Sequence, residues 1–233
     1  MKTGVNRLLM ENNRVTGVEL YNGQRVYSHV VISAVPPKAL QPMITINDSL
    51  LGKAVASTFH LTPSPIVSLH IWLDQHLFHE SFIGFWECDF HWAFQMQMIH
   101  RQLNTRHLTL VTSAADGLLS KTKAELVDLA QRQLRAITQR NVSIQRAVVL
   151  KESEATWVPP IGQVNSRPSI RTPVPNFFLA GDWVDTGLPC TIEGAVKSGH
   201  EAALIAEEYL NQQTTSLTLR LPSISLKSDG AFA

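Results

Sequence analysis

The chain has 233 residues, of which 44% are hydrophobic and 17% are charged, and its formal net charge is +1. This composition supports a substantial core in one large or two small domains. Scattered Lys and Arg residues argue against a nucleic-acid surface, no apolar run is long enough to cross a membrane, and the N-terminus lacks the apolar core of a signal peptide. Cys88 and Cys190 form no disulfide framework or metal motif, so we expect a cytoplasmic protein, with peripheral membrane contact left open.

The N-terminal part predicts a β-meander followed by a buried strand. Residues 5–10, 14–21 and 24–27 read as short strands, and the Asn22-Gly23 dipeptide between the last two favours a hairpin turn. Residues 29–35 (HVVISAV) are continuously apolar and rich in β-branched side chains. Such a run is typical of a strand that is covered on both faces in a parallel sheet.

The middle of the chain predicts a separate layer of sheet and helix. We expect strands over 66–73, 90–98, 108–114 and 144–151, a helix over 121–140 and a loop over 159–175. In residues 90–98 (FHWAFQMQM) strict alternation places Phe90, Trp92, Phe94, Met96 and Met98 on one face. This face is either sheet core or the lining of a lipid cavity.

The C-terminal part returns to a short apolar strand, over 177–180, and a helix over 191–210. The apolar and small positions of this helix that we expect to face inward are Ile192, Ala195, Val196, Gly199, Ala202, Ala203, Ala206 and Leu210. Residues 213–233 are polar and poor in aromatic side chains, which predicts a disordered tail.

The stretch LAGDWVDTGLPCTIEGAVKSG, residues 179–199, carries the main functional signal. Asp182 directly follows a buried strand, where ligands of open α/β sheets collect. Thr191 is a suitable N-cap, so the first-turn amides and the helix dipole offer an anion site. Gly194 and Gly199 each cost about 1 kcal/mol inside a helix, which indicates close approach of a backbone or a ligand. The residues alone support a ligand site and a simple packing unit equally.

The same stretch resembles the C-terminal FAD motif of the flavin-containing amine oxidase and carotenoid desaturase superfamily. In that superfamily AGD or AGE precedes an EGAVxSG helix, and the matching residues here are 180–182 and 193–199. Residues 64–74 (SPIVSLHIWLD), 92–94 (WAF) and 110–116 (LVTSAAD) are similar to the squalene-associated FAD-dependent desaturases.

The resemblance implies a mixed α/β fold with a partial, doubly wound FAD-binding domain, formed by residues 1–40 and 172–212, and a substrate domain at 41–171. It implies that Asp182 accepts a hydrogen bond from the ribityl chain and that the amides of Ile192 and Glu193 face the pyrimidine end of the flavin. The backbone of Val5 matches an adenine-contacting position. The implied FAD-binding residues are Val5, Gly181, Asp182, Thr191, Ile192, Glu193 and Gly194.

One feature departs from the superfamily. Its members open with a strand–GxGxxG–helix unit that holds the pyrophosphate, whereas this sequence contains no GxG. We therefore expect a C-terminal portion of a larger flavoenzyme, inactive by itself, whose first half comes from another segment or chain. Uncovered apolar strand edges would lead it to self-associate.

The function expected from the resemblance is that of an FAD-dependent oxidoreductase acting on an isoprenoid lipid, such as a squalene precursor or a carotenoid-like molecule. A flavin-containing amine oxidase and a non-enzymatic module that has lost the cofactor are the alternatives. The sequence identifies no catalytic acid or base. The spacing of His70, His76 and His79 gives little support to a metal site.

Overall fold

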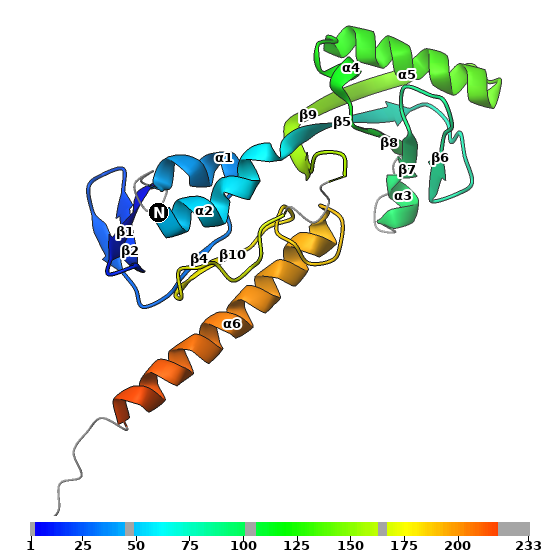
Figure 1. The fold of residues 1–233 in the computed structure, drawn as a ribbon. Coiled ribbons are helices and arrows are strands. Elements are labelled where there is room, and N and C mark those ends of the chain that lie inside the picture. Colours follow the sequence, from blue (N-terminus) through cyan, green and yellow to red (C-terminus); the bar gives the residue numbers. More distant parts are fainter. Residues whose placement is uncertain (1–2, 45–48, 101–105, 163–166, 219–233) are drawn as a thin grey trace, which may run out of the picture. The chain divides into compact units, whose positions relative to one another are not determined.

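The computed structural model describes residues 3–44, 49–100, 106–162 and 167–218, and it has the mixed helix and strand content that the sequence predicts (Figure 1). The chain forms two compact units. The first comprises Met1–Leu61 and Pro159–Ala233, and the second comprises Thr62–Val158. These bounds differ from the boundaries near 40 and 171 that we drew from the sequence. The assignment of the two parts to FAD and substrate binding stays a prediction.

The first unit begins with the three-stranded antiparallel meander that the sequence predicts. It consists of β1 (Val5–Glu11), β2 (Arg14–Leu20) and β3 (Arg25–Tyr27), in that order across the sheet. Asn12, Asn13 and Gly23 have positive φ angles, which explains the choice of these residues at the two turns.

A buried asparagine ties the meander to the next part of the unit. The Asn176 side chain accepts a hydrogen bond from the Val15 N–H (3.0 Å) and donates to the Val15 carbonyl (2.6 Å). It also donates to the His29 carbonyl at 2.9 Å. One side chain therefore satisfies backbone groups of two segments that are distant in sequence.

A two-stranded parallel sheet follows, formed by β4 (Val31–Ser33) and β10 (Phe177–Leu179). All three residues of β10 are buried. The expectation for 29–35 was too broad, because the strand has three residues and Ile32 is 39% exposed. Parallel pairing is confirmed, but coverage of β4 on both faces is wrong for this chain.

Short helices between β4 and the second unit were not expected from the sequence. They are α1 (Pro37–Leu40), α2 (Ser49–Ala56) and two 3₁₀ helices, η1 (Gln41–Met43) and η2 (Ser57–His60). Their main apolar contacts come from Leu40, Leu51 and Val55, each 1% exposed. These segments are too short for a helical period to stand out in the sequence.

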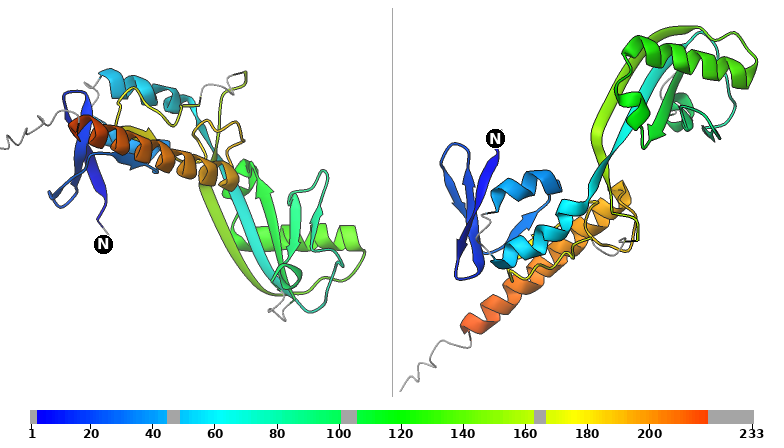
Figure 2. Two further views of the ribbon diagram at one scale, coloured as in Figure 1. Left: turned by 90° about the horizontal axis from the view of Figure 1, so that it is seen from below. Right: turned by 45° about the horizontal axis from the view of Figure 1, so that its top comes forward.

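The unit ends with the long helix α6 (Ile192–Thr218), which runs beside β4 and β10 (Figures 1 and 2). Its predicted inward face is only partly right. The buried positions are Gly194, Ser198, Ala202 and Ala206, spaced four residues apart, whereas Ile192, Val196, Ala203 and Leu210 are exposed. The small residues face the neighbouring strand because they let the helix backbone approach it closely.

The helix also extends beyond the predicted end at 210. Residues 213–218, assigned to a disordered tail, are helical, and the rest of that predicted tail lies outside the described residues. In the described ranges, no helix combines the length and apolar character that a membrane-spanning segment requires.

The second unit is built on a five-stranded antiparallel sheet in the order β6-β7-β8-β5-β9. The strands are β5 (Thr62–Leu73), β6 (Phe82–Gly84), β7 (Trp92–Gln95), β8 (His107–Ser113) and β9 (Ile144–Val158). The sequence placed four of the five, but underestimated the length of β5 and β9, which pair along most of their length.

One face of this sheet packs against helix α5 (Lys123–Thr138) (Figure 1). The helix begins with a capping box, in which Thr122 and Glu125 bond each other's backbone N–H groups. Leu126, Ala130 and Leu134 are fully buried against Leu69 and other residues of the sheet. The short helices α3 (Met96–Ile99) and α4 (Asp116–Leu119) complete the unit.

The predicted strand 90–98 is wrong in both extent and orientation. The strand stops at Gln95, and Met96 begins α3. Ala93 and Gln95 face the core, while Trp92 on the opposite face is 43% exposed. The sheet core therefore lies on the side that α5 covers. Trp92 and Phe94 lie on the opposite face, whereas Phe90, which precedes the strand, is fully buried in the core.

Candidate functional site

The candidate site begins where β10 ends. The Ala180 N–H continues the pairing by donating to the Ser33 carbonyl at 2.8 Å. Gly181 then has a φ of +141°, and a Cβ at this position would clash with the indole of Trp183, which is 1% exposed. The close packing of this tryptophan against the backbone thus requires glycine.

Asp182 lies at the carboxyl end of β10, as the sequence predicts, and is half-buried. The turn around it is closed by a hydrogen bond from the Val184 N–H to the Gly181 carbonyl, at 3.3 Å. Its carboxylate is therefore carried on a short, closed turn next to a buried strand. Such a turn can hold a hydrogen-bond acceptor in a defined place.

The N-terminus of α6 has the cap expected from the sequence. The Thr191 hydroxyl accepts a hydrogen bond from the Gly194 N–H at 3.3 Å. The first two amides, of Ile192 and Glu193, have no partner among the described residues, and the Ile192 side chain is 86% exposed. These amides and the positive end of the helix dipole form an open, anion-favouring site.

Ser198 joins this helix to the turn that carries Asp182. Its hydroxyl is completely buried and accepts a hydrogen bond from the Gly181 N–H at 2.8 Å. It also lies 2.7 Å from the Ala195 carbonyl and 3.0 Å from that of Gly181, to either of which it donates. Sequence analysis treated Ser198 as a small residue and missed this link, which sets the position of Asp182 relative to α6.

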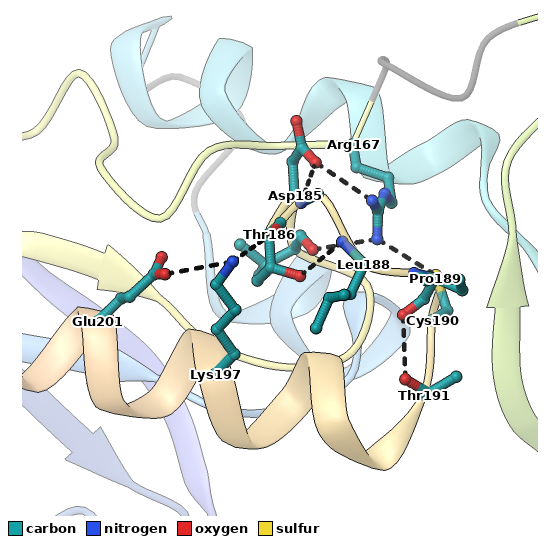
Figure 3. Close-up of polar contacts among 11 residues, drawn as sticks. Arg167, Asp185, Thr186, Leu188, Pro189, Cys190, Thr191, Lys197 and Glu201 are labelled. Carbon is teal, nitrogen blue, oxygen red and sulfur yellow. Dashed lines mark hydrogen bonds and ion pairs between the residues drawn. The ribbon is translucent and has the colours of Figure 1, made fainter.

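The loop between the two elements is held by a buried arginine (Figure 3). The Arg167 side chain is 5% exposed and forms an ion pair with Asp185 at 3.2 Å. It also donates to the Val184 carbonyl at 3.3 Å and contacts the Cys190 sulfur at 3.9 Å. The sequence held no local signal for this contact, because Arg167 lies in an irregular segment 18 residues before its partner.

A lysine on α6 holds the same loop from the other side. Lys197 donates to the Thr186 carbonyl at 2.8 Å and pairs with Glu201 at 3.8 Å (Figure 3). A Cβ on Gly194 would lie 2.8 Å from the Pro189 carbonyl oxygen. The close approach that Gly194 indicates is thus made by the loop itself, and nothing lies within 4 Å of the equivalent position on Gly199.

The structure brings six of the seven predicted cofactor residues to this junction: Gly181, Asp182, Thr191, Ile192, Glu193 and Gly194. Val5 lies at the start of β1, paired with Leu20 in the meander. No cluster of three or more metal-binding side chains occurs in the described part of the chain, and His70 lies against His107 instead.

These residues fit the flavin end of FAD. The half-buried carboxylate is of a type that can accept a hydrogen bond from a polyhydroxyl chain, and the two open amides can stabilise negative charge on an electron-rich ring. The small residues Gly194 and Ser198 keep the helix start close to the strand end. The arrangement as a whole is a strand–loop–helix in an α/β fold whose chemistry is compatible with a flavin.

Comparison with known families gives the same assignment. A model of the flavin containing amine oxidoreductase family matches residues 2–205. The chain belongs to this family, and membership implies FAD as the cofactor.

Curated relatives include enzymes of squalene and carotenoid metabolism. Hydroxysqualene dehydroxylase of Zymomonas mobilis is 38% identical over 99 residues, covering 42% of this chain and 24% of the relative. The enzyme of the same name from Sinorhizobium fredii is 29% identical over 181 residues, or 78% of this chain and 39% of the relative. The 15-cis-phytoene desaturase of Solanum lycopersicum is 26% identical and covers 62% of this chain and 27% of the relative.

Solved structures show the same fold. A putative protoporphyrinogen oxidase from Exiguobacterium sp. 255-15 has a TM-score of 0.67 at 15% identity, covering 90% of this chain and 47% of that protein. An oxidoreductase from Methanosarcina mazei has a TM-score of 0.63, also at 15% identity, covering 86% and 48%. The chain thus spans less than half the length of these relatives and structures.

Proposed function

We propose that this chain is part of an FAD-dependent oxidoreductase acting on an isoprenoid lipid, and that the junction of β10 and α6 holds the flavin end of the cofactor. The observation that carries the proposal is the link through Ser198. It ties the turn that carries Asp182 to the N-terminal half of α6. The acceptor and the two open amides then belong to one bonded strand–turn–helix unit, which supports their acting on the same ligand.

Each residue has a defined role in this proposal. Asp182 accepts a hydrogen bond from the ribityl chain, and the Ile192 and Glu193 amides stabilise negative charge at the pyrimidine end of the ring. Thr191 and Gly194 shape the helix turn, and the backbone of Val5 contacts the adenine end. FAD, when bound, supplies the hydride chemistry.

The substrate class rests on the relatives, whose printed names refer to hydroxysqualene and phytoene. Since the chain spans only part of their length, the activity of the whole protein is part of the proposal. So is a partner segment that supplies the pyrophosphate-binding loop. We also infer that the chain self-associates when that segment is absent.

The test is an FAD titration of the purified chain, followed by flavin fluorescence. Asp182→Ala should weaken binding by about 1.5–3 kcal/mol, because a charge-assisted hydrogen bond is lost. Asp116→Ala, in the second unit, is the matched control and should bind like the wild type. Equal dissociation constants for the wild type and Asp182→Ala, measured at FAD concentrations that saturate the wild type, would rule out this site.

A second measurement separates the proposed substrate class from the amine oxidase alternative. The chain, supplied with FAD and with the partner segment in trans, is offered a polyisoprenoid or a primary amine. Turnover of the polyisoprenoid supports the proposal, whereas oxidation of the amine alone would favour the alternative.

A further inference from the structure

The sheet face opposite α5 carries an exposed cluster of aromatic side chains. Phe82, Trp92 and Phe94, here called the aromatic band, have ring centroids 6.3–6.4 Å apart. Phe82 is 59% exposed and Trp92 is 43% exposed. Together with the half-buried Phe94, these two exposed rings form a surface on one sheet face that is suited to an apolar ligand.

The aromatic band leads directly into a polar cluster on the same face. In the strand register Phe82 lies opposite Phe94, and Phe94 lies opposite Thr109. Thr109 in turn lies opposite His70 on β5. Cross-strand neighbours in one row point to the same face, so the band and the cluster form one continuous surface.

Two histidines form the centre of the cluster. His70 Nδ1 and His107 Nε2 are 3.1 Å apart, and the Thr109 hydroxyl lies 3.0 Å from His70 Nδ1. When two neutral rings share this hydrogen bond, one ring donates and the other accepts. The two nitrogens that remain, His70 Nε2 and His107 Nδ1, are then one donor and one acceptor, whichever tautomers are present. Within the described residues these two nitrogens have no protein partner.

The surroundings of His107 favour its neutral form. Burial lowers the pKa of His107, and the nearby His70 lowers it further. The His107 ring stacks on the Trp72 ring, with centroids 4.3 Å apart. The Arg146 guanidinium carbon also lies over the Trp72 ring, 4.6 Å from its centroid. The cluster thus offers hydrogen-bonding ring nitrogens at the end of an aromatic surface.

We propose that this face binds an isoprenoid alcohol, with the hydrocarbon chain on the aromatic band and the hydroxyl group hydrogen-bonded to the His70–His107 pair. The inference rests on the proposed function for the isoprenoid part of the ligand. The hydroxyl part rests on the geometry, because a hydroxyl both donates and accepts and therefore matches either tautomer. The histidine pair is thus a specificity-determining site that distinguishes an alcohol from the corresponding hydrocarbon.

The experiment compares farnesol, an isoprenoid alcohol, with the hydrocarbon farnesene. Binding to the 233-residue chain is measured without FAD, by tryptophan fluorescence and by retention of radiolabelled ligand. The wild type should prefer farnesol by about five- to tenfold, the effect of one hydrogen bond. His107→Phe, which keeps a ring against Trp72, should remove this preference and leave farnesene binding unchanged.

Two further variants complete the test. His70→Phe should act like His107→Phe, and it keeps the test decisive if one of the two fails to fold. His79→Phe changes an exposed histidine of the same unit and should keep the preference. Trp92→Ala should weaken both ligands equally, because the band contacts the hydrocarbon.

Equal affinity of the wild type for both ligands would overturn the inference, as would a preference that survives in both histidine variants. Because no FAD is present, these measurements do not depend on FAD binding. If the chain prefers the alcohol but fails to bind FAD, the proposed function is wrong and this inference holds. If a polyisoprenoid is turned over but no alcohol preference is found, the proposed function holds and this inference is wrong.

Discussion

Replacing Gly194 and Gly199 by alanine, one at a time, adds the same methyl group to α6 in two different surroundings. At Gly199 no heavy atom lies within 4 Å of the new Cβ. At Gly194 the new Cβ would lie 2.8 Å from the Pro189 carbonyl oxygen. The two substitutions therefore share their effect on helix propensity and differ in steric strain.

The magnitudes follow from these contacts. Glycine to alanine in a helix interior gains about 1 kcal/mol, so Gly199→Ala should stabilise α6 by roughly that amount. The Pro189 carbonyl is backbone, and its loop is held by Thr191 and Lys197. Moving it costs about 1–3 kcal/mol, as in other overpacked sites. Since propensity is common to both variants, their difference in stability measures this strain.

Hydrogen–deuterium exchange of the α6 amides reports the local free energy of opening, which suits a chain with two units. Protection should rise in Gly199→Ala and fall in Gly194→Ala. FAD binding should also weaken in Gly194→Ala, because the displaced loop carries the helix cap. A shift of both variants in the same direction by similar amounts would refute the steric argument.

Three other predictions concern the rest of the chain. Asn176→Leu should destabilise the first unit by about 3 kcal/mol, because buried backbone groups of Val15 and His29 lose their partner; an unchanged urea midpoint would contradict this. The pKa of His107 lies below its ordinary value of 6.5, so the unfolded chain binds more protons as the pH falls through that value and the native state loses stability. His107→Gln should therefore lose less unfolding free energy than the wild type between about pH 7 and 5, as measured by urea unfolding at each pH. Finally, the 233-residue chain purified alone should hold FAD well below one per chain, because it has no GxG for a pyrophosphate cradle; stoichiometric FAD in a monomer would show that the remaining contacts suffice.

Local sequence signals predicted the elements whose structure depends on neighbours in the chain. The Asn22-Gly23 turn and the flanking alternation were enough for the meander, because a hairpin turn sets its own strand register. The strand, Asp182, cap and helix of the candidate site follow one another within 20 residues. Their order therefore places the predicted site residues without knowledge of the rest of the fold.

Only the tertiary structure decided which faces are buried. Alternation in residues 90–98 marked two faces of a strand, but α5 brings Leu126 and Leu134 against the face of Ala93, so Trp92 is left open. Along α6, apolar size suggested Ile192 and Val196 as inward positions. Close contact with the strand end instead selected Ser198 and its small neighbours, because a large side chain would hold the helix away.

The sequence by itself therefore determined the family, the cofactor and the strand–loop–helix that carries Asp182, because the motif is continuous in the chain. The tertiary structure decided the contacts that join distant segments, such as Arg167 with Asp185 and His70 with His107. Those pairs depend on how loops and strands far apart in sequence come together. The residues next to each other in the sequence do not predict these long-range contacts, because the contacts depend on how whole helices, strands and loops pack.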